Sequence, residues 1–146
     1  MDMKAATLNA VSIKKVPTKP VAAADFGQAC YLKLSILEED GINGKPNFTL
    51  KSITPVPDSP YIARQVKDLT DSDLGNYTLR TYNIHGQELR SYALYSARYV
   101  SDVSYTAPSG TIQTYIVRHA GVDAMRVISD GKPSNPIATG TLPNCL

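Results

Sequence analysis

The segment that decides the fold runs from Asn76 to Tyr95 and reads NYTLRTYN-IHG-QELRSYALY. Apolar or aromatic residues alternate with polar ones on both sides of a short segment that ends in Gly86. A period of two residues is typical of a β-strand with one buried face. Gly86 can adopt the positive φ that closes a three-residue hairpin loop. The segment therefore predicts an antiparallel hairpin in which Asn83 lies opposite Gln87.

This register distributes the side chains of the hairpin over two faces. We expect the face that enters the core to carry Tyr77, Leu79, Leu89 and Ala93. The opposite face would carry four candidate binding residues, Arg80, Tyr82, Arg90 and Tyr92. Tyr and Arg are enriched in binding hot spots, and planar aromatic rings also stack on sugars. Two other interpretations stay open: these residues merely cover a sheet, or the face is itself buried.

The register also brings like charges together. Arg80 and Arg90 would face each other directly, which is mildly unfavourable unless an anion or a partner relieves the repulsion.

The first half of the chain shows the same alternation. Residues 30–37 predict a strand with Leu32, Leu34 and Ile36 on one face. The polar cluster at 38–46 predicts a turn, and residues 48–53 a second strand. Three prolines at 55, 57 and 60 interrupt regular pairing. Tyr61, Ile62 and Val66 then suggest another short strand.

The second half predicts two further hairpins. One joins residues 99–105 to 111–118. The other joins residues 124–129 to 132–138 through Asp130-Gly131, a preferred pair for a tight two-residue turn. Pro133 and Pro136 would place the last strand at a sheet edge. Regular short strands with frequent turns predict an all-β fold, an antiparallel sandwich of about seven to nine strands.

The N-terminal segment differs in composition from the rest. Residues 1–25 are rich in Ala, Lys, Thr and Pro, and we expect a flexible arm or linker before a single sandwich domain over residues 26–146. Lys14, Lys15 and Lys19 interrupt every apolar stretch that could serve as a signal peptide. We therefore expect no export signal in the sequence as written, which leaves open a signal that has been removed and a cytoplasmic or viral protein.

Composition excludes several classes of function. The 15 Lys and Arg against 13 Asp and Glu give a net charge of +2, so we expect no nucleic-acid partner. No apolar run approaches the roughly 18 residues of a membrane span, so we expect no membrane insertion. A hydrophobic content of 42% is ordinary for a globular protein.

The residues before the main hairpin resemble a known motif. Asp73, Gly75 and Tyr77 match the Asp-x-Gly-x-Tyr pattern of the tyrosine corner in immunoglobulin-like sandwiches, where the Tyr hydroxyl bonds back to the preceding turn. The cysteine of antibody domains is replaced by Leu79, and the chain has no Trp. Only the sandwich architecture is thus implied.

A second resemblance covers residues 30–140. The order of the strands and turns is similar to that of β-sandwich accessory modules of secreted bacterial enzymes, peptidases among them. The elements that carry this likeness are the Gly75–Tyr82 strand, the Gly86–Leu89 turn and strand, the 125–128 strand and Ser134-Asn135-Pro136. Fibronectin type III domains show a related pattern. The resemblance implies a non-catalytic module.

The two cysteines allow two interpretations. Cys30 and Cys145 could form a disulfide that ties the C-terminal tail to the body, or Cys30 could be a buried thiol and Cys145 part of a frayed tail. A catalytic thiol needs a histidine base, and nothing in the sequence pairs Cys30 with one.

Metal and catalytic motifs are weak. Asp71, Asp73 and Asn76 crowd one turn as calcium ligands do, but the spacing departs from an EF-hand loop and a polar turn explains them equally. His85 and His119 are expected to be lone exposed imidazoles in turns. We therefore expect no enzyme activity, no cofactor and no metal.

The sequence favours a non-catalytic binding, adhesion or spacer module of an extracellular or cell-surface protein. Its partner would be a protein, a glycan or a neighbouring domain of a larger chain. The alternative is a structural subunit of a virion or fibre that assembles through its sandwich and its N-terminal arm.

Overall fold

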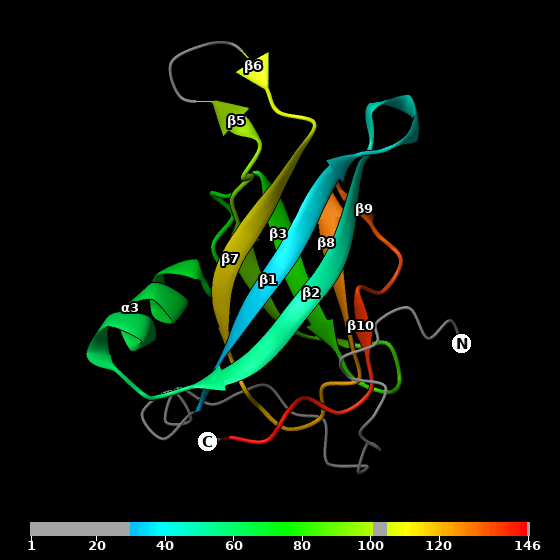
Figure 1. The fold of residues 1–146 in the computed structure, drawn as a ribbon. Coiled ribbons are helices and arrows are strands. Elements are labelled where there is room, and N and C mark those ends of the chain that lie inside the picture. The colour runs from blue at the N-terminus through cyan, green and yellow to red at the C-terminus, as the bar shows by residue number, and fades with distance from the viewer. Residues whose placement is uncertain (1–29, 101–104, 146) are drawn as a thin grey trace.

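Eight strands form two antiparallel sheets that pack against each other, which confirms the predicted all-β fold (Figure 1). The computed structural model describes residues 30–100 and 105–145, so the predicted arm of residues 1–25 lies outside the described residues. One sheet has the order β2-β1-β7, and the other has the order β10-β8-β3-β4 with β9 also paired to β8. The strands are β1 (Tyr31–Asp40), β2 (Pro46–Val56), β3 (Tyr77–Tyr82), β4 (Glu88–Leu94), β7 (Ser109–Val117), β8 (Ala124–Ser129), β9 (Lys132–Pro133) and β10 (Ala138–Thr139).

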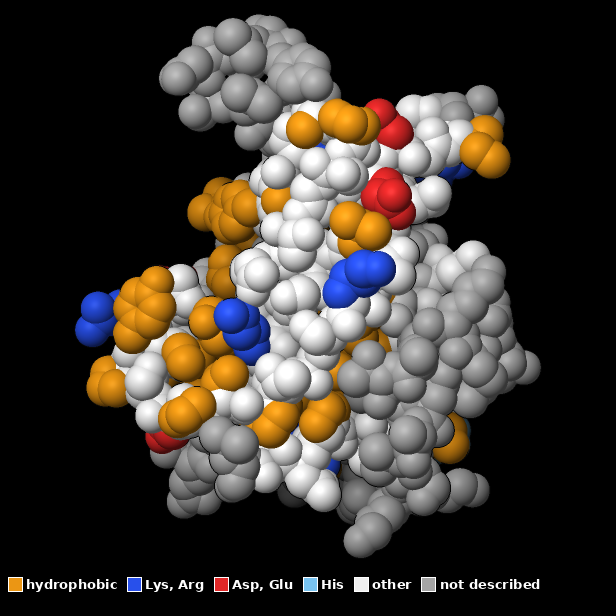
Figure 2. All heavy atoms as spheres, in the orientation of Figure 1, with side chains coloured by type: hydrophobic (Ala, Val, Ile, Leu, Met, Phe, Trp, Pro, Cys, Tyr) orange, Lys and Arg blue, Asp and Glu red, His pale blue; other side chains and the backbone are white. Residues whose placement is uncertain are grey.

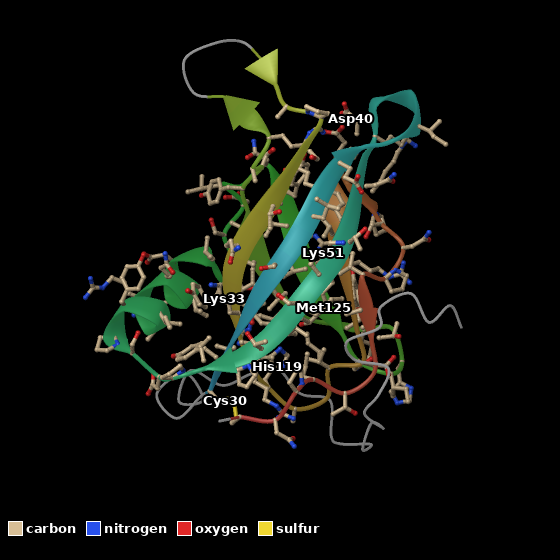
Figure 3. The ribbon with its side chains drawn as sticks, in the orientation of Figure 1. Cys30, Lys33, Asp40, Lys51, His119 and Met125 are labelled. Carbon is tan, nitrogen blue, oxygen red and sulfur yellow. A yellow bond between two sulfur atoms is a disulfide. The ribbon has the colours of Figure 1, made fainter. Side chains whose placement is uncertain are left out.

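The three-stranded sheet follows the predicted alternation. Leu32, Leu34 and Ile36 all lie on the buried face of β1. The turn to β2 contains a one-turn 3-10 helix, η1 (Ile42–Gly44). The opposite face of this sheet is mainly polar and faces the viewer in Figure 2, where Lys33 and Lys51, labelled in Figure 3, add positive charge.

The predicted hairpin between residues 99–105 and residues 111–118, the region of β7, is wrong. The strand pairs with β1, where Ile112 lies opposite Ile36 and Ile116 opposite Leu32. The preceding segment instead forms its own two-stranded pair, β5 (Tyr99–Val100) with β6 (Tyr105–Thr106). In this position the apolar residues of β7 extend the buried face of β1, and this burial favours the long-range pairing over pairing with the neighbouring segment.

The last predicted hairpin is confirmed at its turn, but the predicted strand over residues 132–138 is divided into β9 and β10, which both pair with β8. Ser129 lies opposite Lys132, and the turn residues Asp130 and Gly131 have φ of 50° and 73°. Both residues of a type I′ turn need positive φ, which Asp-Gly tolerates.

The short strand predicted around Tyr61–Val66 is wrong, because this segment is the helix α3 (Pro60–Leu69). Ser59 caps it: its Oγ accepts a hydrogen bond from the Ile62 N–H at 3.1 Å. Pro60 occupies the first turn, where a missing N–H costs nothing. Val66 is buried, so one face of the helix packs on the body.

A disulfide between Cys30 and Cys145 fixes the C-terminal segment beside the start of β1 (Figure 3). This confirms the disulfide interpretation of the two cysteines. The Arg118 guanidinium adds a second attachment, because its Nε donates to the Pro143 carbonyl at 2.5 Å. Between the sheets the core contains Leu79 and Leu94 from the main hairpin, Met125 and Val127 from β8, and Leu142 from the C-terminal segment.

Candidate functional site

The main hairpin forms as predicted at its loop and differs in the strands. The Asn83 N–H donates to the Gln87 carbonyl, and Gly86 has a φ of 77°. Tyr82 lies opposite Glu88, but Thr81 lies opposite Arg90. Leu89 is therefore an extra residue, a β-bulge that shifts the register of the rest of β4 by one position.

This shift divides the four candidate binding residues between two faces. Arg80 and Tyr82 lie on the outward face of β3, whereas Tyr92 lies opposite the core residue Leu79 and is fully buried. A one-residue slip moves every side chain of a strand to the opposite face. The predicted single surface of four residues is thus wrong.

Arg90 also leaves the outward face. Its NH1 donates to Asp71 Oδ2 at 2.8 Å, and its side chain is 13% exposed. Arg80 faces Ser91 on one side and Arg126 on the other, so the predicted Arg80–Arg90 pair is replaced by Arg80–Arg126.

The outward face of β3 continues onto β8 and contains a hollow. Tyr82 lies opposite Ala124, and Arg80 lies opposite Arg126. Beside this pairing is a hollow of about 320 Å³, which we call the Tyr82 hollow. Its lining residues come from the hairpin loop, β8 and the proline-containing segment after it: Tyr82, Asn83, Ile84, Gly86, Asp123, Ala124, Arg126, Pro133 and Pro136.

Backbone hydrogen bonds hold the walls of the Tyr82 hollow. The Asp123 N–H donates to the Tyr82 carbonyl at 2.7 Å, and the Asp123 carbonyl accepts from the Gly140 N–H at 2.8 Å. Arg126 NH1 donates to the Ser134 carbonyl at 2.8 Å. Three residues that line the hollow, Tyr82, Asp123 and Arg126, are therefore held by hydrogen bonds to neighbouring segments.

The loop at the rim of the hollow is also ordered by its own side chains. Asn83 is buried, and its Oδ1 accepts from the N–H groups of His85 and Gln87. Its Nδ2 donates to Gln87 Oε1 at 2.8 Å. Three of the four hydrogen bonds that the Asn83 amide can make thus shape the loop.

Charges in the Tyr82 hollow are separated. Among the described residues the ion pairs join Arg80 to Glu88, Arg90 to Asp71 and Arg98 to Asp40, and none joins Asp123 to Arg126. The residues that line the hollow therefore include the aromatic Tyr82, the basic Arg126 and the acidic Asp123, and the last two do not form an ion pair with each other.

Two other hollows carry less convergent chemistry. One of about 290 Å³ lies beside α3 and is lined by residues such as Gln65, Leu69 and Tyr95. Another of about 470 Å³ lies between the β1–β2 and β8–β9 turns, where its charged residues, Lys45, Asp130 and Lys132, are all exposed.

Two of the three candidate calcium residues have side-chain partners in the structure. Asp71 contacts Arg90 and Ser91, and Asn76 Oδ1 accepts from the Ser96 N–H at 2.8 Å. Asp73 is exposed in the same turn. Across the part of the chain that the structure describes, no three His, Cys, Asp or Glu side chains gather as metal ligands.

Tyr77 reaches across to the opposite sheet. Its hydroxyl donates to Glu38 Oε2 at 2.6 Å, so this donor is directed to β1 and not to the turn at Asp73 and Gly75 as the motif predicted. Gly75 is needed for close packing, since a Cβ there would lie 2.6 Å from the Leu94 backbone nitrogen.

The two histidines differ in burial. His85 is exposed in the hairpin loop, as predicted. His119 is only 8% exposed, which corrects the prediction, and its Nε2 lies 3.5 Å from Thr81 Oγ1. His119 lies two residues after the end of β7, and its imidazole is buried beside Thr81 of β3.

The prediction missed Asp123 and Arg126 as site residues. Asp123 precedes a strand that was recognised and Arg126 lies within it, but only the pairing of β8 with β3 places them beside Tyr82. The one available signal was the alternation along Ala124–Ser129, which puts Arg126 on the face opposite Met125 and Val127.

Comparisons with protein-family models, with curated proteins and with solved structures return no match. Within the described residues, no helix is long and apolar enough to cross a membrane.

Proposed function

We propose that the chain is a non-catalytic binding module of an extracellular or cell-surface protein, built on an immunoglobulin-like sandwich. It recognises its partner, a glycan or a protein, through the outward face of β3 and β8. The observation that carries this proposal is the Tyr82 hollow, which is lined by an aromatic, a basic and an acidic residue: Tyr82 on β3, Arg126 on β8 and Asp123 just before β8. A few polar groups around an apolar, concave surface are typical of a binding site.

The disulfide supports the extracellular part of the proposal. Disulfides persist in oxidising compartments and are rare where thiols are kept reduced. The Cys30–Cys145 bond closes a separation of 115 residues and so constrains nearly the whole described fold.

The fixed backbone of the hollow supports recognition by a preformed surface. Both walls belong to strands or to segments bonded to them, as the Asp123–Tyr82 and Arg126–Ser134 hydrogen bonds illustrate. A preorganised site loses little conformational entropy on binding, which favours affinity.

The test is a binding screen of the native protein on purified polysaccharides and on immobilised surface proteins, repeated with Tyr82→Ala. We expect at least one specific interaction, weakened about tenfold or more by Tyr82→Ala. Tyr61→Ala is the matched control, because Tyr61 is exposed on α3, away from the hollow. Binding that both variants retain equally would refute the proposed surface.

A second candidate function, assembly into a fibre, is favoured by β2. This strand of 11 residues pairs only with β1 among the described strands, and an unpaired strand edge is a surface on which another copy can add a strand. The bulge at Lys51 interrupts that edge and works against pairing. Concentration-dependent association in sedimentation velocity would favour assembly over the binding module.

A further inference from the structure

We infer that the Tyr82 hollow binds a neutral sugar ring, an assignment that rests on the proposed function and names its ligand class. The hollow is lined by Asp123, whose carboxylate can accept hydrogen bonds, and by Arg126, whose guanidinium can donate them, and none of the ion pairs among the described residues joins the two. A sugar hydroxyl both donates and accepts hydrogen bonds, as serine hydroxyls do. Neighbouring hydroxyls of one ring can therefore satisfy both groups together.

The charge pattern selects against ionic ligands. A carboxylate or sulfate on the sugar would pair with Arg126 but would be repelled by Asp123 in the same hollow. An ammonium group would meet the opposite conflict. A neutral polyol uses both charged groups in charge-assisted hydrogen bonds, which are stronger than neutral ones.

The apolar part of the hollow fits the other face of a sugar. The half-buried Tyr82 ring lies on the strand next to Arg126, and Pro133 and Pro136 complete an apolar surface. The C–H face of a pyranose packs on such rings while its hydroxyls point sideways. The volume of about 320 Å³ lies at the small end of ligand sites, which matches one or two sugar rings.

The hairpin loop at the rim of the hollow indicates the direction in which a longer glycan would extend. Ile84 is 46% exposed at the rim, and Gly86 adds no side chain there. The hollow is thus open at the loop, so the sugar can belong to a longer glycan that extends past it.

The experiment is a titration of the ¹⁵N-labelled native protein, followed by amide chemical shifts, with neutral oligosaccharides (xylohexaose, cellohexaose and mannohexaose) and with acidic ones (a galacturonate trimer and a hyaluronan hexasaccharide). We expect a neutral oligosaccharide to shift amides at residues 82–86 and 123–126. Its affinity should be insensitive to added NaCl.

The variant Asp123→Asn gives opposite signs for the two ligand classes. It should weaken a neutral sugar about tenfold, because a charge-assisted hydrogen bond becomes a neutral one. It should strengthen an acidic sugar, because a repulsive carboxylate is removed. Asp73→Asn is the matched control, since Asp73 is exposed in a different turn.

Two results would overturn the inference and leave the proposed function standing. One is binding of acidic oligosaccharides only, strengthened by Asp123→Asn. The other is no sugar binding by a protein whose partner, found in the screen above, is lost in Tyr82→Ala. Shifts confined to α3 or β2 would overturn both the inference and the proposed surface.

Discussion

Replacement of Glu38 by leucine should remove the main polar link between the two sheets. Glu38 is fully buried near the end of β1 and has no Lys or Arg ion-pair partner among the described residues. Its Oε2 accepts from the Tyr77 hydroxyl at 2.6 Å and from Ser96 Oγ at 2.7 Å. Its Oε1 accepts from the Ala97 N–H at 2.9 Å. The buried carboxylate is therefore compensated by hydrogen bonds alone.

The magnitude follows from the hydrogen bonds that are lost. A hydrogen bond to a charged group contributes about 1.5–3 kcal/mol, and leucine keeps the volume but accepts none. Release of the desolvation cost of a buried charge offsets part of the loss. We expect Glu38→Leu to lower the free energy of unfolding by about 3–5 kcal/mol, a large fraction of a typical total of about 5–15 kcal/mol.

The assay is urea unfolding followed by circular dichroism, with the disulfide oxidised, on Glu38→Leu, Tyr77→Phe and the double variant. The double-mutant cycle should give a coupling energy of about 1.5–3 kcal/mol for the hydroxyl–carboxylate pair. Glu39→Leu, at the exposed neighbouring position, is the control and should change stability by about 0.5 kcal/mol or less. A coupling below about 0.5 kcal/mol would show that Glu38 and Tyr77 act independently, and the reasoning would fail.

Two further predictions concern the disulfide and a buried tyrosine. Replacement of both Cys30 and Cys145 by serine should cost about 4–5 kcal/mol, because the bond closes a loop of about 115 residues in the unfolded chain; a loss under about 1 kcal/mol in urea unfolding would contradict the loop-entropy argument. Burial raises the pKa of Tyr92 above its usual 10.0, while the Val117 backbone and the Arg90 guanidinium oppose the shift without cancelling it. Because the folded state holds this proton more tightly, its contribution to stability is complete below pH 10 and is lost as the pH rises toward the folded-state pKa, by about 1.4 kcal/mol per pH unit. Tyr92→Phe should show a shallower loss of stability in alkaline unfolding curves, and an unchanged slope would argue against the shift.

The sequence predicted those parts of the fold that depend on local patterns. Leu32, Leu34 and Ile36 alternate with polar residues, and the two tight turns contain Gly86 and Gly131 where positive φ is required. Such signals depend on residues a few positions apart. The fold class and the hairpin loops could be recognised for this reason.

The helix α3 was missed because its strongest signals lie at its start. Ser59-Pro60 is an N-cap followed by a residue suited to the first helical turn. The three prolines at 55, 57 and 60 were instead interpreted as residues that interrupt regular strand pairing. Ile62, Val66 and Leu69 are spaced at four and three residues, which is too short a stripe to stand out from period-two alternation.

Glu38 was assigned to a polar turn because a carboxylate is seldom fully buried. Its partners Tyr77, Ser96 and Ala97 follow it in the chain by 39 to 59 residues. No local sequence pattern indicates that these donors lie beside Glu38. Its role as a hydrogen-bond acceptor between the two sheets therefore depends on tertiary structure alone.

The candidate site shows how one inserted residue decides which side chains can act together. With unbroken pairing, Arg80, Tyr82, Arg90 and Tyr92 would form a single surface. The bulge at Leu89 turns Tyr92 into the core, where it lies opposite Leu79. Arg80 and Tyr82 then find their outward neighbours on β8, in Arg126 and Ala124. The pairing of β3 with β8 spans more than 40 residues and is fixed by the burial of Leu79 against Val127. A candidate surface on a sheet therefore depends on strand order as much as on strand sequence, and in this fold the strand order supplies both charged groups that we propose to contact the sugar.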